Sequence, residues 1–421
     1  MRKTALWAAA LTAVAALTAS ACGGGPAAGG QKADQVEVFS WWTSGSEAAA
    51  LDALIDNFKK ANPGVTVRNA AVSGGGGSNA QQVLQTRLVG GNPPDTWQTH
   101  PGKAMSEILD NGLALDLTDV YAAHKWNSVM PKPLIEAMSR DGKVYGVLTG
   151  VHRGNVLWFN KKVLAEAGVS VGDRLSRQEF DRALDRLRAK GRTPLCLGDK
   201  DIFASAEVLE NVLVGRLGAT GWQRLVSGET HWSDPKVRAA VKEYTKLLDR
   251  VNDDHSALTW DQAVKRMADG GCGFNTMGDW AYGELLKNGK RDGEDFGYVA
   301  FPGSEDVFVT VGDVFVASAS GKNADLVKKW IASVGSKDSQ LAFNKAKGST
   351  PVRTDVDVSS LGAYQQAAAQ DFRNRTLVST LVHGEATSPG FQQAFFDAVN
   401  QLNSNKDVDA FVKALDAAAR K

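Results

Sequence analysis

The stretch Val36–Gly64, VEVFSWWTSGSEAAALDALIDNFKKANPG, determines the fold class of this chain. Val36–Ser40 has the alternating pattern of a strand. Apolar residues then recur at helical spacing from Leu51 to Phe58, and the Pro63-Gly64 pair ends that helix. A second extended pattern, VTVRNAAV, follows directly. The order strand, helix, strand is the unit of a parallel sheet covered by helices, so we predict an α/β fold.

Length and charge narrow the class of protein. A chain of 421 residues is too long for one ordinary core, so we expect two lobes. Its hydrophobic fraction of 43% and charged fraction of 23% are typical of a globular protein. Removing Arg2 and Lys3 from the 48 basic residues leaves 46 against 47 acidic ones. This balance excludes general nucleic-acid binding, which needs a positive field.

The N-terminus has the pattern of an export signal over residues 1–21. A basic start and an apolar run lead to small residues before Cys22. This resembles a bacterial lipoprotein signal, in which Cys22 is acylated, although Ala19 stands where leucine is commoner. An ordinary secretory signal is the alternative. Residues 22–34, rich in glycine, read as a flexible tether, and no later run is long and apolar enough to span a bilayer.

The two remaining cysteines each lie in a short apolar run that reads as a strand. They are Cys196 in RTPLCLGD and Cys272 in GGCGFNT. In an exported protein such a pair more often forms a disulfide than stays free, so we predict a disulfide, with two buried thiols as the alternative. Two cysteines without a histidine at ligand spacing do not make a structural zinc site.

Aromatic and polar side chains concentrate near the predicted ends of strands and helices. Trp41 and Trp42 are adjacent, so one side chain can face the core while the other faces a cleft. Glu47 follows Ser44 at capping-box spacing, which predicts a helix cap, and it can also face a ligand. Asp313 lies in the apolar strand VGDVFVAS, where an unpaired charge would cost several kcal/mol, so it needs partners or a ligand.

Further candidates share this placement beside tryptophans or in loops. They are Gln98 and His100 in DTWQTHPG, Asp279 and Trp280 in FNTMGDW, and His383 in LVHGEA. Flat indoles suit the C–H faces of a sugar, and carboxylate, amide and imidazole groups suit its hydroxyls. The set therefore predicts carbohydrate binding in a compact cleft.

The sequence patterns that could indicate an enzyme are weaker than those that indicate sugar binding. The G-x-S-x-G match at residues 168–172 lies between a helix and a loop, without the strand and helix that a nucleophile elbow needs. A secreted glycoside hydrolase would need two carboxyl groups about 5–10 Å apart across the scissile bond. Glu47 and Asp313 would be candidates for this pair, but the sequence shows no such constellation. We therefore predict a protein without catalytic residues or a cofactor.

Several stretches in order resemble the extracellular solute-binding proteins of ATP-binding-cassette sugar importers, the maltose-binding-like group. They are VEVFSWWTSGSE, GNPPDTWQTHPG, GKVYGVLTG, LWFNKKVLAEAGV, GGCGFNTMGDW and FPGSEDVF. SWWTSGSE, WQTH and DWAYGELL are most similar to its glucose- and galactose-binding branch. The resemblance implies a two-lobed periplasmic-binding-protein-like fold (type II), each lobe a sheet covered by helices, with the ligand in the interlobe cleft.

The resemblance also implies roles for individual residues. Trp42 and Trp280 would stack on the sugar, and Trp41 would serve packing. The groups that would bond its hydroxyls are Glu47, Gln98, His100, His152, Asp279, Asp313 and His383. A disaccharide or longer ligand is the alternative, for which Trp158, Trp222, Trp232 or Trp260 would supply extra subsites or else belong to the core.

The resemblance further implies the organisation and partners of the chain. We expect an N-terminal lobe at 35–146 and 301–349 and a C-terminal lobe at 147–300 and 350–421. The lobes would be joined by crossings near 145–147, 298–301 and 349–351, and they would close on a monosaccharide. The protein would be a monomer held by a lipid at Cys22 on the outer face of the cytoplasmic membrane, and it would deliver sugar to the permease subunits of the importer.

Overall fold

Two β-sheets organise the described part of the chain. The computed structural model describes residues 34–74, 77–321 and 323–420. The predicted export signal at 1–21, Cys22 and all of the predicted tether except its last residue lie outside the described residues. Among the described helices, none combines the length and the apolar character needed to cross a membrane.

The first sheet confirms the β-α-β start. Its order is β12-β11-β3-β1-β2, with β6 also paired to β11, and β1 runs parallel to both β2 and β3. Its strands are β1 (Gln35–Phe39), β2 (Thr66–Asn69), β3 (Thr96–Thr99), β6 (Val147–Arg153), β11 (Val307–Ala317) and β12 (Thr376–Ser379). β6 and β12 fall in ranges that the sequence division gave to the other lobe.

The second sheet has the order β10-β7-β9-β8. Its strands are β7 (Val156–Asn160), β8 (Thr193–Cys196), β9 (Cys272–Thr276) and β10 (Phe296–Ala300). A separate hairpin pairs β4 (Ser139–Arg140) with β5 (Lys143–Val144). This sheet is mixed, because β8 and β9 are parallel while β7 and β10 are antiparallel.

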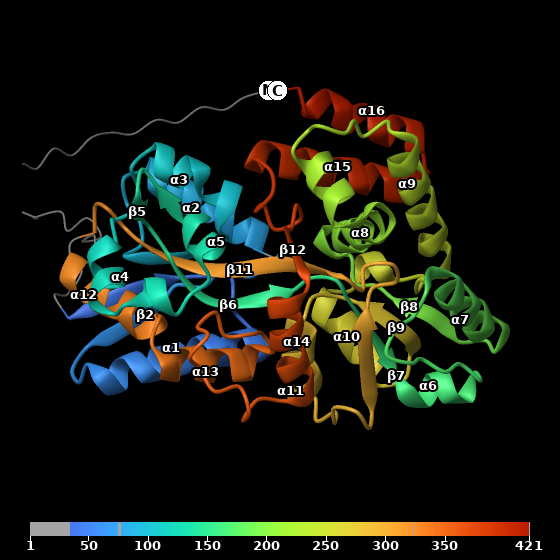
Figure 1. The fold of residues 1–421 in the computed structure, drawn as a ribbon, viewed down its shortest axis with the longest axis horizontal. Helices are drawn as coiled ribbons and strands as arrows, with labels where there is room; N and C mark the ends of the chain where they lie inside the picture. Colours follow the sequence, from blue (N-terminus) through green and yellow to red (C-terminus); the bar gives the residue numbers. More distant parts are fainter. Residues whose placement is uncertain (1–33, 75–76, 322, 421) are drawn as a thin grey trace, which may run out of the picture. The chain divides into compact units, whose positions relative to one another are not determined.

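Helices cover both sheets (Figure 1). Those before β6 are α1 (Gly45–Ala61), α2 (Ser78–Val89), α3 (Ser106–Asp110), α4 (Thr118–Ala123) and α5 (Lys132–Glu136). Those between β7 and β10 are α6 (Lys161–Glu166), α7 (Arg177–Ala189), α8 (Phe203–Val226), α9 (Pro235–Leu247), α10 (Trp260–Ala268) and α11 (Trp280–Lys287). Those after β11 are α12 (Ala324–Val334), α13 (Lys337–Lys347), α14 (Ala363–Asn374), α15 (Pro389–Asn405) and α16 (Val408–Ala418). The predicted cap of α7 is confirmed, since Ser176 and Glu179 form a capping box.

Each sheet has its own hydrophobic core, and β11 belongs to both. α1, α12 and α13 pack in the first core, together with Val314–Ala317 of β11. α8, α10, α11 and α15 pack in the second core, which also takes Val309 and Val311. The chain therefore passes from one lobe to the other within β11, and again between β6 and β7.

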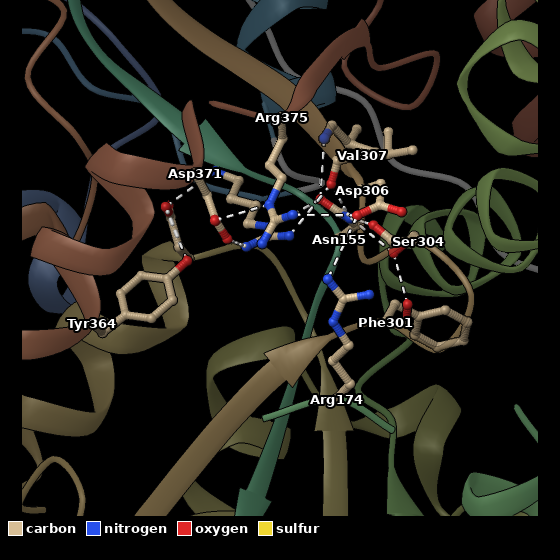
Figure 2. Close-up of polar contacts among 12 residues, drawn as sticks. Asn155, Arg174, Phe301, Ser304, Asp306, Val307, Tyr364, Asp371 and Arg375 are labelled. Atoms are coloured by element: carbon tan, nitrogen blue, oxygen red, sulfur yellow. Dashed lines mark hydrogen bonds and ion pairs between the residues drawn. The ribbon is translucent and has the colours of Figure 1, made fainter. Parts of the chain in front are cut away.

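A buried amide links two of the crossing segments (Figure 2). Asn155, between β6 and β7, donates from Nδ2 to the Ser304 hydroxyl at 2.8 Å and to the Val307 carbonyl at 2.9 Å. Its Oδ1 accepts from the Val309 amide at 3.0 Å. The Val307 carbonyl and the Val309 amide would each cost about 1–3 kcal/mol if left unpaired in the interior. The two crossings are thus held at a fixed spacing.

An ion-pair chain extends this network to the end of α14 (Figure 2). Arg153 at the end of β6 pairs with Asp371 at 2.5 Å, and Arg375 contacts both Asp371 at 3.0 Å and Asp306 at 3.2 Å. The Arg153 side chain is 6% exposed, so solvent screens its pair with Asp371 less than it screens a surface pair. Segments far apart in sequence therefore meet at the junction of the lobes.

The predicted disulfide is present. Cys196 at the end of β8 and Cys272 at the start of β9 are bonded, with their Cα atoms 5.7 Å apart. This separation is within the range of about 4.4–6.8 Å found for disulfides. Both residues are buried in the second core, so the bond joins two neighbouring strands of that lobe.

Thiol labelling of the mature protein, denatured without reductant, should modify neither cysteine. The bond closes a loop with a sequence separation of 76, and a loop of this size corresponds to about 4 kcal/mol of stabilisation in the chain-entropy account. Replacing both cysteines by serine should therefore lower the melting temperature clearly. Labelling of both thiols in the unreduced protein would contradict the bond.

Candidate functional site

A cavity lies where the two cores meet. Its volume is about 40 Å³, enough for a few water molecules. The residues that line it are Trp41, Trp42, Glu47, His100, His152, Phe203, Trp260, Trp280, Val311, Asp313, Lys347 and His383. Seven of the nine predicted binding residues are in this set. The other two, Gln98 and Asp279, are buried and bonded to residues that line it.

The lining residues come from the ends of strands and helices. Trp41 and Trp42 follow β1 and His100 follows β3, at the carboxyl ends of parallel strands, where ligands bind in open α/β sheets. Trp280 begins α11 directly after β9, and His383 follows β12. The topology thus brings together side chains that are up to 342 positions apart in the sequence, from 41 to 383.

The two tryptophans predicted to stack on a ligand face this one cavity from different lobes. Trp42 is 1% exposed and packs in the first core, whereas Trp280 is 5% exposed and packs in the second. The ammonium group of Lys347 lies 5.6 Å from the ring centre of Trp42 and 5.7 Å from that of Trp280. Both distances are within the reach of about 6 Å for a cation–π contact.

Lys347 was not predicted. It ends α13 and forms an ion pair with Glu47 in the first turn of α1. A signal for it exists in the sequence: Gln340, Phe343 and Lys347 recur at helical spacing and share the buried face of α13. A lysine on the apolar face of a helix needs a partner, and here it has a carboxylate and two indoles.

A chain of buried polar groups runs beside the cavity. His152 contacts Asp279 Oδ1 through Nδ1 at 2.5 Å and Asp313 Oδ2 through Nε2 at 3.0 Å. The Gln98 amide donates to Asp313 Oδ1 at 2.9 Å, and its oxygen accepts from the Trp41 amide at 3.2 Å. The predicted need of Asp313 for partners is confirmed, since both of its oxygens are bonded.

The charges in this row of hydrogen-bonded groups favour the ionised forms of His152 and Asp313. Burial lowers the pKa of His152, but the carboxylates of Asp279 and Asp313 outweigh burial and leave its pKa above the ordinary value. Burial likewise raises the pKa of Asp313, and the bond and charge of His152 together with the charge of Lys347 bring that pKa below its ordinary range. His152 is thus an imidazolium that donates from both nitrogens to two carboxylates.

The other two histidines that line the cavity, His100 and His383, are neutral. Burial lowers the pKa of His100, and burial together with the charge of His100 lowers the pKa of His383 far below its ordinary value. His100 Nδ1 lies 2.8 Å from the Gly312 carbonyl, which can only accept, so the proton is on Nδ1 and Nε2 can accept a bond. These rings offer an acceptor or a neutral donor to a ligand.

Two buried polar atoms of residues that line the cavity have no hydrogen-bond partner among the described residues. They are Trp42 Nε1 and His383 Nε2. Buried polar groups are normally paired, and unpaired ones in a cavity mark a place for water or for a polar ligand. A molecule with several hydroxyls, each donating and accepting, meets this demand.

One sequence expectation is wrong and another is incomplete. The capping box expected between Ser44 and Glu47 does not form, because the Ser44 side chain makes no cap bond and Glu47 pairs with Lys347 instead. Trp41, assigned to packing, is buried in the first core, and it also lines the cavity and contacts His100, with ring centres 5.2 Å apart.

The four tryptophans considered for extra subsites divide between the core and the cavity. Trp158, Trp222 and Trp232 are buried in the second core, which supports their alternative assignment to packing. Trp260 is half-buried at the start of α10 and lines the cavity. An aromatic surface beyond the two predicted indoles is therefore available.

Comparison with known proteins places these features in context. Residues 53–371 match the family described as bacterial extracellular solute-binding proteins. The chain is 30% identical over 404 residues to an uncharacterized ABC transporter extracellular-binding protein of Pyrococcus horikoshii, covering 94% of this chain and 91% of the relative. It is 32% identical over 422 residues to a probable sugar-binding periplasmic protein of Brucella melitensis, covering 96% and 98%. A xylose/arabinose-binding protein of Haloferax volcanii is 27% identical over 398 residues, covering 90% and 84%.

Solved structures share the two-lobed fold at low identity. The galactopyranose-preferring bacterial solute receptor AcbH superposes with a TM-score of 0.80 at 17% identity, covering 92% of this chain and 97% of that one. A chitin oligosaccharide binding protein superposes with a TM-score of 0.81 at 18% identity, covering 92% and 98%. These likenesses confirm the predicted fold class.

Glu210 holds the loop that carries His383, and its titration predicts how the stability of the protein depends on pH. Glu210 Oε2 on α8 accepts from the Thr380 hydroxyl at 3.1 Å, the Leu381 amide at 3.2 Å and the Val382 amide at 2.9 Å. Burial raises the pKa of Glu210 from 4.5 to about 7. Because the pKa of Glu210 is higher in the folded state than in the unfolded state, the protonated residue stabilises the fold, fully below pH 4.5. This stabilisation is lost as the pH rises through about 7.

Glu210→Gln keeps the acceptor oxygen and removes the titration. Between pH 5 and pH 8 the wild-type free energy of unfolding should fall more than that of the variant, by up to about 3 kcal/mol. Urea unfolding at the two pH values measures the difference, and other buried acids cancel because both proteins contain them. Equal pH dependence in the two proteins would contradict the raised pKa.

Proposed function

The chain belongs to the family of bacterial extracellular solute-binding proteins, and we propose that it captures a monosaccharide similar to glucose or galactose for an ABC importer. The observation that carries the proposal is the pair Trp42 and Trp280, which face one buried cavity from two different lobes. The Brucella relative, a probable sugar-binding protein, and the Haloferax relative, a xylose/arabinose-binding protein, support the same class of ligand.

The chemistry of the cavity suits a pyranose. The indole faces match the C–H faces of the ring, and paired carboxylates with fixed donors hold oxygens ready to accept from hydroxyls. Asp313 is fixed by Gln98 and His152, so its remaining lone pairs keep one orientation. A rigid set of partners rejects a sugar whose hydroxyls do not match, because unpaired buried groups cost about 1–3 kcal/mol each.

The small cavity implies that capture involves movement of the lobes. A volume of about 40 Å³ is far below the roughly 300–1,000 Å³ of ligand pockets in general, so the walls must separate for a sugar to enter. Contacts from both lobes then favour the closed form, because only that form makes both sets. We propose crossings at Gly154–Asn155, directly after β6, within β11, where the core changes between Val311 and Val314, and near Ser349, of which the sequence suggested only the last.

The chain is a binding protein and not an enzyme, so its carboxylates hold the sugar without cleaving it. In our proposal the closed, loaded form docks on the permease subunits of the importer as a monomer, and the sugar passes inward when the transporter acts. Neither a cofactor nor a nucleic acid has a part in this mechanism.

The location of the protein follows from its predicted export signal. We propose that Cys22 is acylated and that residues 22–34 tether the lobes to the outer face of the cytoplasmic membrane, on the periplasmic side where an outer membrane exists. A lipid chain with a flexible tether keeps the protein close to its permease, which raises the effective concentration of the loaded form.

A disaccharide or longer ligand is the second candidate. Trp260 favours it, because this half-buried indole lines the cavity in addition to Trp42 and Trp280. A third aromatic surface is what a second sugar ring would need. Calorimetry with monosaccharides and their oligomers separates the two candidates by the size of the sugar that binds most tightly.

The main test of the proposed monosaccharide binding is a substitution of Trp280. Trp280→Ala should weaken monosaccharide binding by well over tenfold, since stacking of one ring on an aromatic side chain has been worth on the order of 1–3 kcal/mol for nucleobases. Calorimetry with glucose and galactose measures the change. Trp222→Phe, altered in the second core away from the cavity, is the matched control. Unchanged affinity for Trp280→Ala would remove this residue from the site.

The lipid anchor has its own test. Cys22→Ser should move the protein from the membrane fraction to the soluble fraction or the medium, because the acylated residue is lost. Wild-type protein already found outside the membrane fraction would refute the anchor and favour an ordinary secretory signal.

A further inference from the structure

α1 begins beside the cavity without a cap of its own. This helix of 17 residues starts at Gly45, and Ser44 contributes no side-chain bond to its first amides. The amides at the start of a helix are unsatisfied and carry partial positive charge, so a helix end without an acceptor is unfavourable when buried. Ser46 in this turn is 3% exposed.

The acceptor comes from the other lobe. Glu284 on α11 accepts from the Ser46 amide through Oε2 at 3.3 Å, across 238 positions of sequence. α11 packs in the second core through Trp280 and Leu285, whereas α1 packs in the first core through Leu51 and Leu54. The bond therefore spans the cleft.

The carboxylate is held ready for this contact. Asn288, one turn further along α11, donates to Glu284 Oε1 at 2.9 Å, which leaves Oε2 directed at α1. Glu284 is 8% exposed, so solvent screens its interaction with the helix end only weakly.

Two glycines permit the close approach of the lobes at this point. A Cβ on Gly45 would lie 2.5 Å from Glu284 Oε2, and a Cβ on Gly283 would lie 2.6 Å from the Ala346 carbonyl at the end of α13. A side chain at Gly283 would meet backbone and push α11 away from α13, whereas one at Gly45 would displace the Glu284 carboxylate from its contact with α1. The sequence thus has no Cβ at either point of contact.

We propose that Glu284 is a positioning residue for ligand binding, which caps α1 across the cleft only when the lobes are closed. The cap fixes the turn that carries Glu47, and Glu47 in turn lines the cavity and pairs with Lys347. In the open form this carboxylate and the start of α1 are separately hydrated. This inference rests on the proposed function, because it assigns part of the affinity for the sugar to a residue that does not touch it.

The variants are Glu284→Ala and Glu284→Gln. Removing the carboxylate should weaken the affinity for glucose or galactose, whichever binds wild type more tightly, by about three- to thirtyfold. Gln keeps an oxygen acceptor and loses the charge, so its effect should be smaller. The loss should come from faster dissociation with little change in the association rate, because the contact forms only on closure.

Two further measurements distinguish the proposed positioning role of Glu284 from a purely structural role. The melting temperature of the ligand-free protein should be unchanged in Glu284→Gln, which keeps an acceptor for Asn288, because the ligand-free lobes open and the cap is then absent. Glu229→Gln, an exposed glutamate of the second lobe with 64% of its side chain accessible, is the matched control for a lost charge and should bind like wild type.

The outcomes separate this inference from the function it rests on. If wild type binds neither monosaccharide nor their oligomers, the proposed function fails and the cap has no ligand to serve. If wild type binds and Glu284→Ala stays within threefold of it, only the cap is refuted. A loss equal to that of Glu229→Gln, or one explained by a lower melting temperature without ligand, refutes it as well.

Discussion

His152 is shared by two buried carboxylates, Asp279 and Asp313, and the arrangement of the cavity depends on this contact. A single charge in such a place would be strongly unfavourable, and breaking a buried pair by removing one partner costs about 3–5 kcal/mol. The three residues come from β6, β11 and the segment before α11. Because both lobes contribute, the contact fixes where the walls of the cavity meet.

The same contact extends in two directions. On one side Asp313 reaches Gln98 and through it the backbone of Trp41. On the other side Asp279 accepts from the Arg153 amide at 3.0 Å and from the Tyr364 hydroxyl at 3.3 Å, which leads to the ion pairs at the junction of the lobes. Side chains that would hold a sugar and segments that would bend on closure thus belong to one hydrogen-bonded system.

Much of this arrangement could be predicted from the sequence, because its causes are local. The β-α-β start follows from hydrophobic periodicity, and the need of Asp313 for partners follows from the cost of a charge in an apolar strand. The cap of α7 formed as predicted, since Ser176 and Glu179 bond to each other's backbone amides within one turn. The similar pattern at Ser44 and Glu47 failed because Lys347, 300 positions away, takes the glutamate.

What could not be predicted depends on contacts between lobes. Lys347 lies on the buried face of a helix, yet its position between two indoles follows only from the fold. β6 joins the first sheet because it pairs with β11, a long-range choice that strand propensity does not determine. The cap from Glu284 requires the closed arrangement of α11 against α1, which no local pattern records.

The most direct measurement is a crystal structure of the protein with the monosaccharide that binds it most tightly. We expect one pyranose ring in the cavity, with an indole from each lobe against it and its hydroxyls bonded to Asp313 and its neighbours. A ring bound to one lobe alone, or at a site remote from Trp42 and Trp280, would rule out the proposed binding mode.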